Sequence, residues 1–143
     1  MKLLDLNLLL YAIDESAPHH GRARPWLEGV LSGTEQVGFA WIVLLGFLRI
    51  STNPAIFERP LEPAEALDYL DGWLDQSIAA VVQPTERHAS HLRELLASVG
   101  TAGNLTSDAH LAALAIEHGA ELCSCDTDFA RFPGLRWRDP LKP

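Results

Sequence analysis

Four aspartates lie where predicted strands and helices meet, and together they could form one acidic pocket. Asp5 ends the apolar run Leu3-Leu4, and Asp126 follows another apolar run, with Asp128 two residues later. Asp108 lies between them in the sequence, at the start of a strongly helical stretch. In an open parallel sheet the carboxyl ends of the strands share one edge, where ligand sites form. Acids that are far apart in the sequence could therefore meet at that edge.

Carboxylates that meet in this way need a positive charge between them. Two of them repel by about 4 kcal/mol at a separation of about 4 Å and an effective dielectric constant of about 20. A hard divalent cation removes this cost, and ligands that are all oxygen suit Mg²⁺ or Mn²⁺. The pattern therefore predicts a metal-dependent phosphodiesterase.

Each acid also has a purely structural alternative. Asp5 could only cap the helix that follows it, and Asp108 could only interact with the dipole of its own helix. Asp126 and Asp128 could belong to an Asp-rich turn. Asn7 could orient a ligand or a water, or could stabilise a turn. These alternatives stay open on the sequence alone.

The charged residues limit how the chain could contact phosphate. The formal net charge of −8 argues against tight, non-specific nucleic-acid binding through a broad basic surface. It leaves a nuclease possible, because part of the negative charge can surround a metal. The only lysines are Lys2 and Lys142, so the internal lysine of a P-loop is missing. Arg49 lies on an otherwise apolar helix, where it needs an acid of the pocket or a phosphate as its partner.

No run in the 143 residues is long and apolar enough to span a bilayer, and no signal peptide is recognised. Cys123 and Cys125 are interpreted as small buried side chains in a reducing compartment. We therefore expect a cytoplasmic protein that does not associate with a membrane.

Strand-like and helix-like segments alternate along the chain, without a repeat or a linker. We expect Thr85 to cap the fifth helix, and Thr106 or Ser107 to cap the sixth. The alternation predicts one α/β domain over residues 1–143, with a mostly parallel central sheet of four to five strands. The predicted strands cover 3–4, 36–40, 78–82, 122–125 and, as an optional fifth, 136–138, and the predicted helices cover 7–13, 22–31, 41–50, 63–76, 85–98 and 106–118.

Four segments together resemble a known family of nucleases. They are Leu3–Asn7, Phe47–Pro54, Asp108–Ala115 and Cys125–Phe132. In their order and combination they resemble the PIN-domain ribonucleases of the VapC group, the toxins of type II toxin–antitoxin systems. The resemblance implies a three-layer α/β/α domain and Mg²⁺- or Mn²⁺-dependent endonuclease cleavage of RNA, often at one site in tRNA or rRNA. It also implies a cognate VapB-like antitoxin as partner, and a homodimer.

The resemblance assigns roles to individual residues as well. Asp5, Asp108 and Asp126 match three catalytic acids that hold the metal, and Asp128 resembles a further acid near that pocket. In the mechanism that this metal site would support, Asn7 could help to orient the water shell of the ion.

Thr127 would also orient this water shell. Many members of the family carry a glutamate in the region that Leu45-Gly46-Phe47 occupies here, and this chain has no acid there. We therefore expect one tightly held ion with several waters, and not two permanent ions.

Two other functions remain open. An aspartate-dependent phosphatase usually begins with Asp-x-Asp and uses an internal lysine, but Asn7 occupies the second position here and the lysine is missing. The other alternative is a catalytically silent binding module, which the missing glutamate motivates. Such a module would keep its acids for folding or for binding a partner.

Overall fold

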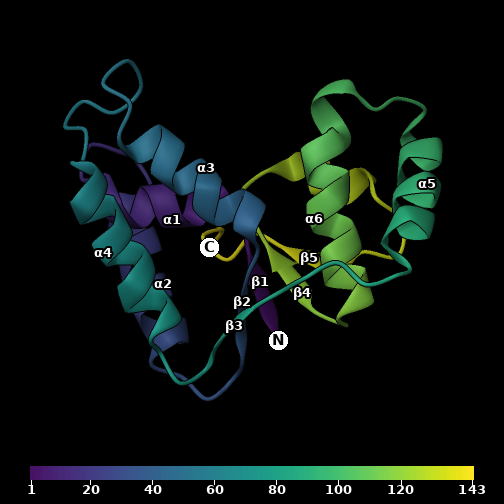
Figure 1. Cartoon of the computed structure of the whole chain (residues 1–143), viewed down its shortest axis with the longest axis horizontal. Coiled ribbons are helices and arrows are strands. Elements are labelled where there is room, and N and C mark those ends of the chain that lie inside the picture. Colours follow the sequence, from purple (N-terminus) through teal and green to yellow (C-terminus); the bar gives the residue numbers. More distant parts are fainter.

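A five-stranded sheet runs through the middle of the protein, in a computed structural model that describes residues 1–143 (Figure 1). All neighbouring strands are parallel, and their order is β3-β2-β1-β4-β5. The predicted parallel sheet is confirmed, including its optional fifth strand. The strands are β1 (Lys2–Leu4), β2 (Val37–Phe39), β3 (Ala79–Val81), β4 (Glu121–Cys123) and β5 (Trp137–Arg138).

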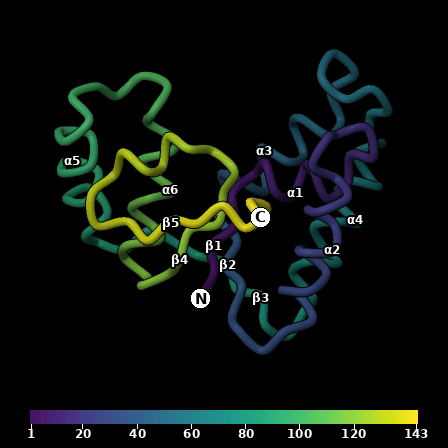
Figure 2. Tube along the Cα trace, turned by 180° about the vertical axis from the view of Figure 1, so that it is seen from behind, coloured from purple at the N-terminus to yellow at the C-terminus, as the bar shows by residue number.

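Two groups of helices cover the two sides of this sheet. Helices α1 to α4 lie on one side, and α5 and α6 lie on the other (Figure 1). The view from behind shows the same separation (Figure 2). The predicted three-layer α/β/α fold is therefore confirmed. The helices are α1 (Leu6–Ile13), α2 (His20–Leu31), α3 (Trp41–Ser51), α4 (Pro63–Leu74), α5 (His88–Val99) and α6 (Thr106–Glu117), with two short 3₁₀ helices, η1 (Gly103–Leu105) and η2 (Thr127–Arg131).

The sheet and both helix layers share one hydrophobic core. A single cluster of 31 buried residues includes side chains from the sheet and from all six helices, so the layers are held together by one contiguous interior. Leu3, Leu4 and Leu122 are fully buried. Apart from their first residues, Lys2 and Glu121, β1 and β4 are apolar, as expected for strands that are covered on both faces. No helix combines the length and the apolar character needed to cross a bilayer.

The predicted caps of two helices are wrong. Helix α5 begins at His88 with Arg87 at its cap position. The Thr85 hydroxyl accepts from the Arg87 N–H in the turn before the helix while it donates to Glu117. Helix α6 has no side-chain cap, because η1 leads directly into it. Thr106 is already helical, with φ −61° and ψ −48°, whereas a capping residue needs an extended backbone.

Gly38 lets three segments approach closely at the middle of the sheet. It lies in β2, and a Cβ atom there would be 2.7 Å from Val82 Cγ2 and 3.0 Å from Met1 Sδ. Real Cβ contacts are longer than this. Any side chain at this position therefore has to push its neighbours apart.

We expect Gly38→Ala to lower the free energy of unfolding by about 1–3 kcal/mol through overpacking. The matched control is Gly72→Ala in α4, where nothing lies within 4 Å of the added Cβ. That change should raise stability by about 0.5–1 kcal/mol, because alanine favours a helix over glycine. Urea denaturation followed by circular dichroism measures both. Equal stability of Gly38→Ala and the wild type would show that Val82 and Met1 relax at no cost.

Candidate metal centre

The pairing of β1 with β4 brings two polar side chains together at the carboxyl edge of the sheet. Leu4 pairs with Cys123, and the next N–H along β1, that of Asp5, donates to the Cys123 carbonyl at 3.0 Å. Asp5 and Ser124, the residues that follow, are therefore neighbours. The fully buried Ser124 hydroxyl donates a 2.6 Å hydrogen bond to Asp5 Oδ2.

Asn7 completes this arrangement from the first turn of α1. Its Nδ2 group donates to Asp5 Oδ2 at 3.2 Å and to Ser124 Oγ at 3.1 Å. Its Oδ1 atom accepts from the Cys125 N–H at 3.3 Å. The amide of Asn7 thus connects the start of α1 to the end of β4 and holds the Asp5 carboxylate in one orientation.

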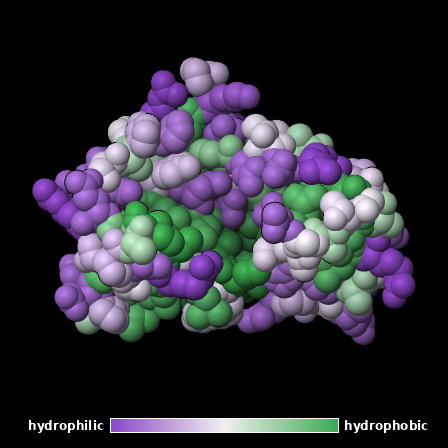
Figure 3. All heavy atoms as spheres, turned by 90° about the horizontal axis from the view of Figure 1, so that it is seen from above, coloured by the Kyte–Doolittle hydropathy of each residue, from purple (hydrophilic) through white to green (hydrophobic).

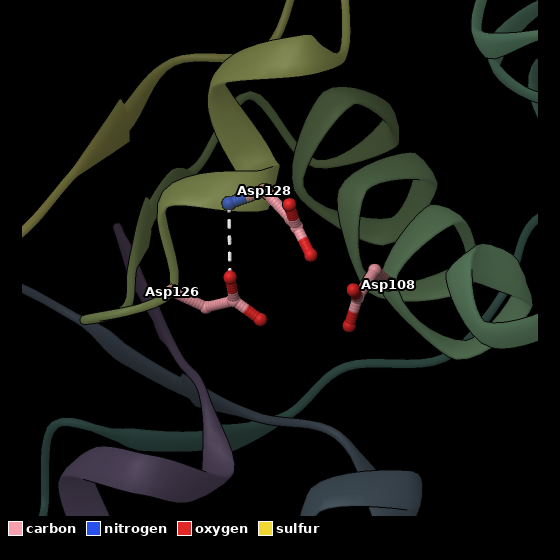
Figure 4. A group of neighbouring side chains, drawn as sticks. All are labelled: Asp108, Asp126 and Asp128. Carbon is pink, nitrogen blue, oxygen red and sulfur yellow. Dashed lines mark hydrogen bonds between the residues drawn. The ribbon is translucent and has the colours of Figure 1, made fainter.

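Three further carboxylates gather beside this network. Carboxylate oxygens of Asp108, Asp126 and Asp128 all lie within 4.8 Å of one another, on the first turn of α6 and on the turn that follows β4 (Figure 4). Asp126 is held on both sides, because its N–H donates to Ser124 Oγ at 3.0 Å and its Oδ1 accepts from the Asp128 N–H at 2.9 Å. Ser124 therefore links Asp5 directly to the three-acid group.

The charges of these acids are poorly compensated. None of the four forms an ion pair with Lys, Arg or His. Burial raises the pKa of Asp108 to about 6, and the negative charges of Asp126, Asp5 and Asp128 add to the effect. Burial also raises the pKa of Asp5, against hydrogen bonds from Ser124 and the Leu6 N–H that lower it.

A divalent cation fits this donor set. Two oxygens bound to one ion at about 2.0–2.6 Å each can be at most about 5 Å apart. The oxygens of Asp108, Asp126 and Asp128 meet this condition. They are hard ligands, and their repulsion has no protein cation to offset it. The residues present therefore suit an ion such as Mg²⁺, Mn²⁺ or Ca²⁺.

The other predicted site residues lie in different surroundings. Thr127 is exposed at the start of η2, and its side chain forms no hydrogen bond. Arg49 is exposed in the last turn of α3 and has no ion-pair partner, so it does not bond to an acid of the pocket. Because Arg49 is exposed, water can accept the hydrogen bonds that its guanidinium group donates.

Close packing restricts Gly46, the middle residue of the region without a glutamate, whereas Leu45 beside it is exposed. Gly46 is buried in α3, and a Cβ atom there would lie 2.7 Å from Leu6 Cδ2. Helix α3 therefore approaches the start of α1 closely at this point. An acid at Gly46 would require the Leu6 side chain to move away.

Sequence reasoning missed Ser124. A signal for it exists, because Ser124 interrupts an otherwise apolar strand end two residues before Asp126. A polar side chain in such a buried position needs hydrogen-bond partners, and polar groups at the carboxyl end of the strand can supply them. The pairing of β1 with β4 identifies these partners.

The raised pKa of Asp108 predicts how stability depends on pH without metal. The folded protein binds this proton more tightly than the unfolded chain, so the stability of the metal-free protein falls as pH rises toward about 6. Asp108→Asn removes the charge. It should stabilise the metal-free protein by about 1 kcal/mol at about pH 7.5, a value reduced for solvent screening, and have little effect at about pH 4.

Thermal unfolding in EDTA at both pH values measures this difference. Asp68→Asn, an exposed acid of α4, is the control and should not change Tm at either pH. A Tm for Asp108→Asn below that of the wild type at neutral pH would mean that the Asp108 carboxylate is compensated in a way the structure does not show.

Comparison with known proteins identifies the family of the chain. The PIN domain family matches residues 2–135 of the chain. Ribonuclease VapC37 of Mycobacterium tuberculosis is 49% identical over 140 residues, which cover 98% of this chain and 97% of that protein. Ribonuclease VapC33 of the same species is 42% identical over 142 residues, which cover 99% of each.

Solved structures with the same fold include two VapBC structures with bound DNA. VapBC2 from Rickettsia felis, bound to a promoter DNA fragment, has a TM-score of 0.70 at 20% identity and covers 96% of both chains. DNA-bound VapBC from Salmonella typhimurium has a TM-score of 0.68 at 21% identity and covers 97% of both. At these identities the likeness concerns the fold alone. With the family match and the full-length relatives, it follows that the chain belongs to the PIN-domain family, in its VapC ribonuclease group.

Proposed function

We propose that this protein is a metal-dependent endoribonuclease toxin that hydrolyses phosphodiester bonds in RNA, with tRNA or rRNA as the substrate class. The observation that carries the proposal is the group of three carboxylates within 4.8 Å, at the carboxyl edge of the sheet and without a protein cation. Full-length relatives at 49% and 42% identity are named ribonucleases.

Asp5, Asp108 and Asp126 would be the catalytic acids and would hold Mg²⁺ or Mn²⁺ together with Asp128. The bound ion would supply a water of lowered pKa and stabilise negative charge on the phosphate. Asp108 would release its proton as the cation binds, so cation affinity should increase as pH rises through about 6. Thr127 would orient the surrounding waters.

Other residues hold the catalytic acids in place. Ser124 and Asn7 fix Asp5, and the N–H of Asp128 fixes Asp126. This preorganisation means that the carboxylates need not rearrange when substrate binds. The exposed guanidinium of Arg49 would contact an RNA phosphate, since it has no protein partner.

A cognate VapB-like antitoxin would hold the enzyme inactive, as the composition of the neighbouring VapBC structures suggests. We further propose that the toxin forms a homodimer and acts in the cytoplasm. The net charge of −8 means that RNA binding should depend on contacts near the acids and not on a broad basic surface.

A catalytically silent binding module is the second candidate, and the absence of an acid at Leu45-Gly46-Phe47 favours it. Leu45 is exposed and would accommodate a carboxylate, so the chain lacks this acid although there is room for one. A silent module would cut no RNA and would bind neither Mg²⁺ nor Mn²⁺ at millimolar concentration in calorimetry. Metal binding with cleavage distinguishes the enzyme from it.

Asp5→Asn and Asp126→Asn should each reduce Mg²⁺-dependent RNA cleavage by about a hundred-fold or more, because each removes a charge that stabilises the reacting centre. The measurement is RNA-end mapping with the purified protein, with and without EDTA. Asp68→Asn is the matched control and should cleave normally. Full activity of either variant would remove that acid from the mechanism, and full wild-type activity in EDTA would exclude a metal-dependent reaction.

Ser124→Ala should weaken Mg²⁺ affinity and cleavage by about 10–100-fold, because it frees the Asp5 carboxylate and leaves the Asp126 N–H without its partner. It should also lower the free energy of unfolding by about 1–3 kcal/mol. Ser90→Ala, on the exposed face of α5, is the control. Calorimetry with Mg²⁺ gives the affinity directly. Wild-type affinity and rate in Ser124→Ala would show that the hydroxyl does not position the acids.

A further inference from the structure

Tyr11 and His19 form an aromatic pair where the chain leaves α1. Their ring centroids are 5.2 Å apart, with the planes inclined by 46°. His20 Nδ1 lies 2.9 Å from the Tyr11 carbonyl oxygen, which fixes the segment between α1 and α2 against the end of α1. His19 is exposed and Tyr11 is half-buried. The pair is therefore held in place yet accessible to a ligand.

The pair lies on the side of α1 that carries the acid network. Tyr11 follows Asn7 by four residues, and residues with this spacing lie on the same face of a helix. Asn7 contacts Asp5 and Ser124, so this face is directed toward the end of β4. Burial raises the pKa of Tyr11, and the negative charges of Cys125, Asp126 and Asp5 raise it further, as expected for a phenol close to these groups.

An RNA strand whose phosphate lies at the acids has to place the neighbouring bases on the surfaces around them. Single-stranded bases are bound by stacking on Tyr and His rings, because every base has a π face. The exposed His19 ring, which packs against Tyr11 in a tilted arrangement, offers such a surface. The hollow between the α1 to α4 side and the α5 to α6 side leaves the space for a strand (Figure 3).

We propose that the Tyr11–His19 pair binds one nucleobase of the RNA beside the scissile phosphate, by stacking on the His19 ring. The inference rests on the proposed ribonuclease function and adds a binding residue to it. The pair contributes to substrate affinity and to the choice of cleavage site, while the chemical step belongs to the acids. Loss of the ring should therefore raise KM and leave kcat unchanged.

The binding test uses the full chain with the Asp126→Asn change and short single-stranded RNA oligonucleotides that carry 2-aminopurine at one position each. Stacking quenches 2-aminopurine fluorescence, so one position should be quenched when the protein binds. Adding His19→Ala should abolish the quenching, and adding His19→Phe should restore it. Quenching that is the same with and without the His19 ring at every position would overturn the proposal.

The kinetic test replaces the quenched nucleotide by an abasic one. In the otherwise wild-type enzyme, His19→Ala and the abasic change should each raise KM about ten-fold, within the range for one base on one aromatic ring. Together they should raise it no further, because both remove the same contact. Additive effects overturn the proposal even if His19→Ala lowers Tm.

His91→Ala is the matched control, because α5 lies on the opposite side of the molecule from α1 (Figure 1). It should change neither quenching nor KM. A wild-type enzyme that cleaves no RNA with Mg²⁺ or Mn²⁺ would contradict the proposed function. The fluorescence test needs no cleavage and would still decide whether the aromatic pair binds a base.

Discussion

Repulsion between carboxylates at the carboxyl edge of the sheet is the interaction that the surrounding structure has to withstand. Asp108, Asp126 and Asp128 have oxygens within 4.8 Å, and no cationic side chain offsets their charge. Such a group separates unless rigid elements oppose it. The opposing elements are the packing of α6 against β4 and the continuous core that both share. The protein thus uses fold stability to maintain a centre that is itself destabilising.

Hydrogen bonds determine the orientation of the acids. Ser124 is the central residue, because its hydroxyl donates to Asp5 and accepts from the Asp126 N–H. A hydroxyl can do both at once, which an alanine or a carboxylate cannot. One small buried side chain therefore couples two acids that are 121 positions apart in the sequence.

Local signals allowed most of the fold and the acids to be predicted from the sequence. The helical spacing of apolar residues and the short apolar runs depend only on neighbouring residues, so the order of elements and the parallel sheet followed from them. Asp108, Asp126 and Asp128 were recognisable because they stand at the ends of elements. The strand order and the role of Ser124 in positioning the acids could not be predicted, since both depend on pairing between distant segments. Thr85 was wrong as a cap because α5 begins only at His88, and the Thr85 hydroxyl lies in the turn before it, where it donates to the distant Glu117.

The central position of β1 also has a consequence for synthesis of the protein. Strand β1 leaves the ribosome before the other strands of the sheet, but one of its two partners, β4, begins only at Glu121. A nascent chain therefore carries Asp5 without Ser124 or Asp126 beside it until the segment that contains β4 has been made. Truncated products that end before β4 lack the assembled centre altogether. Strand topology thus delays the appearance of a complete acidic centre until the turn after β4 has been synthesised.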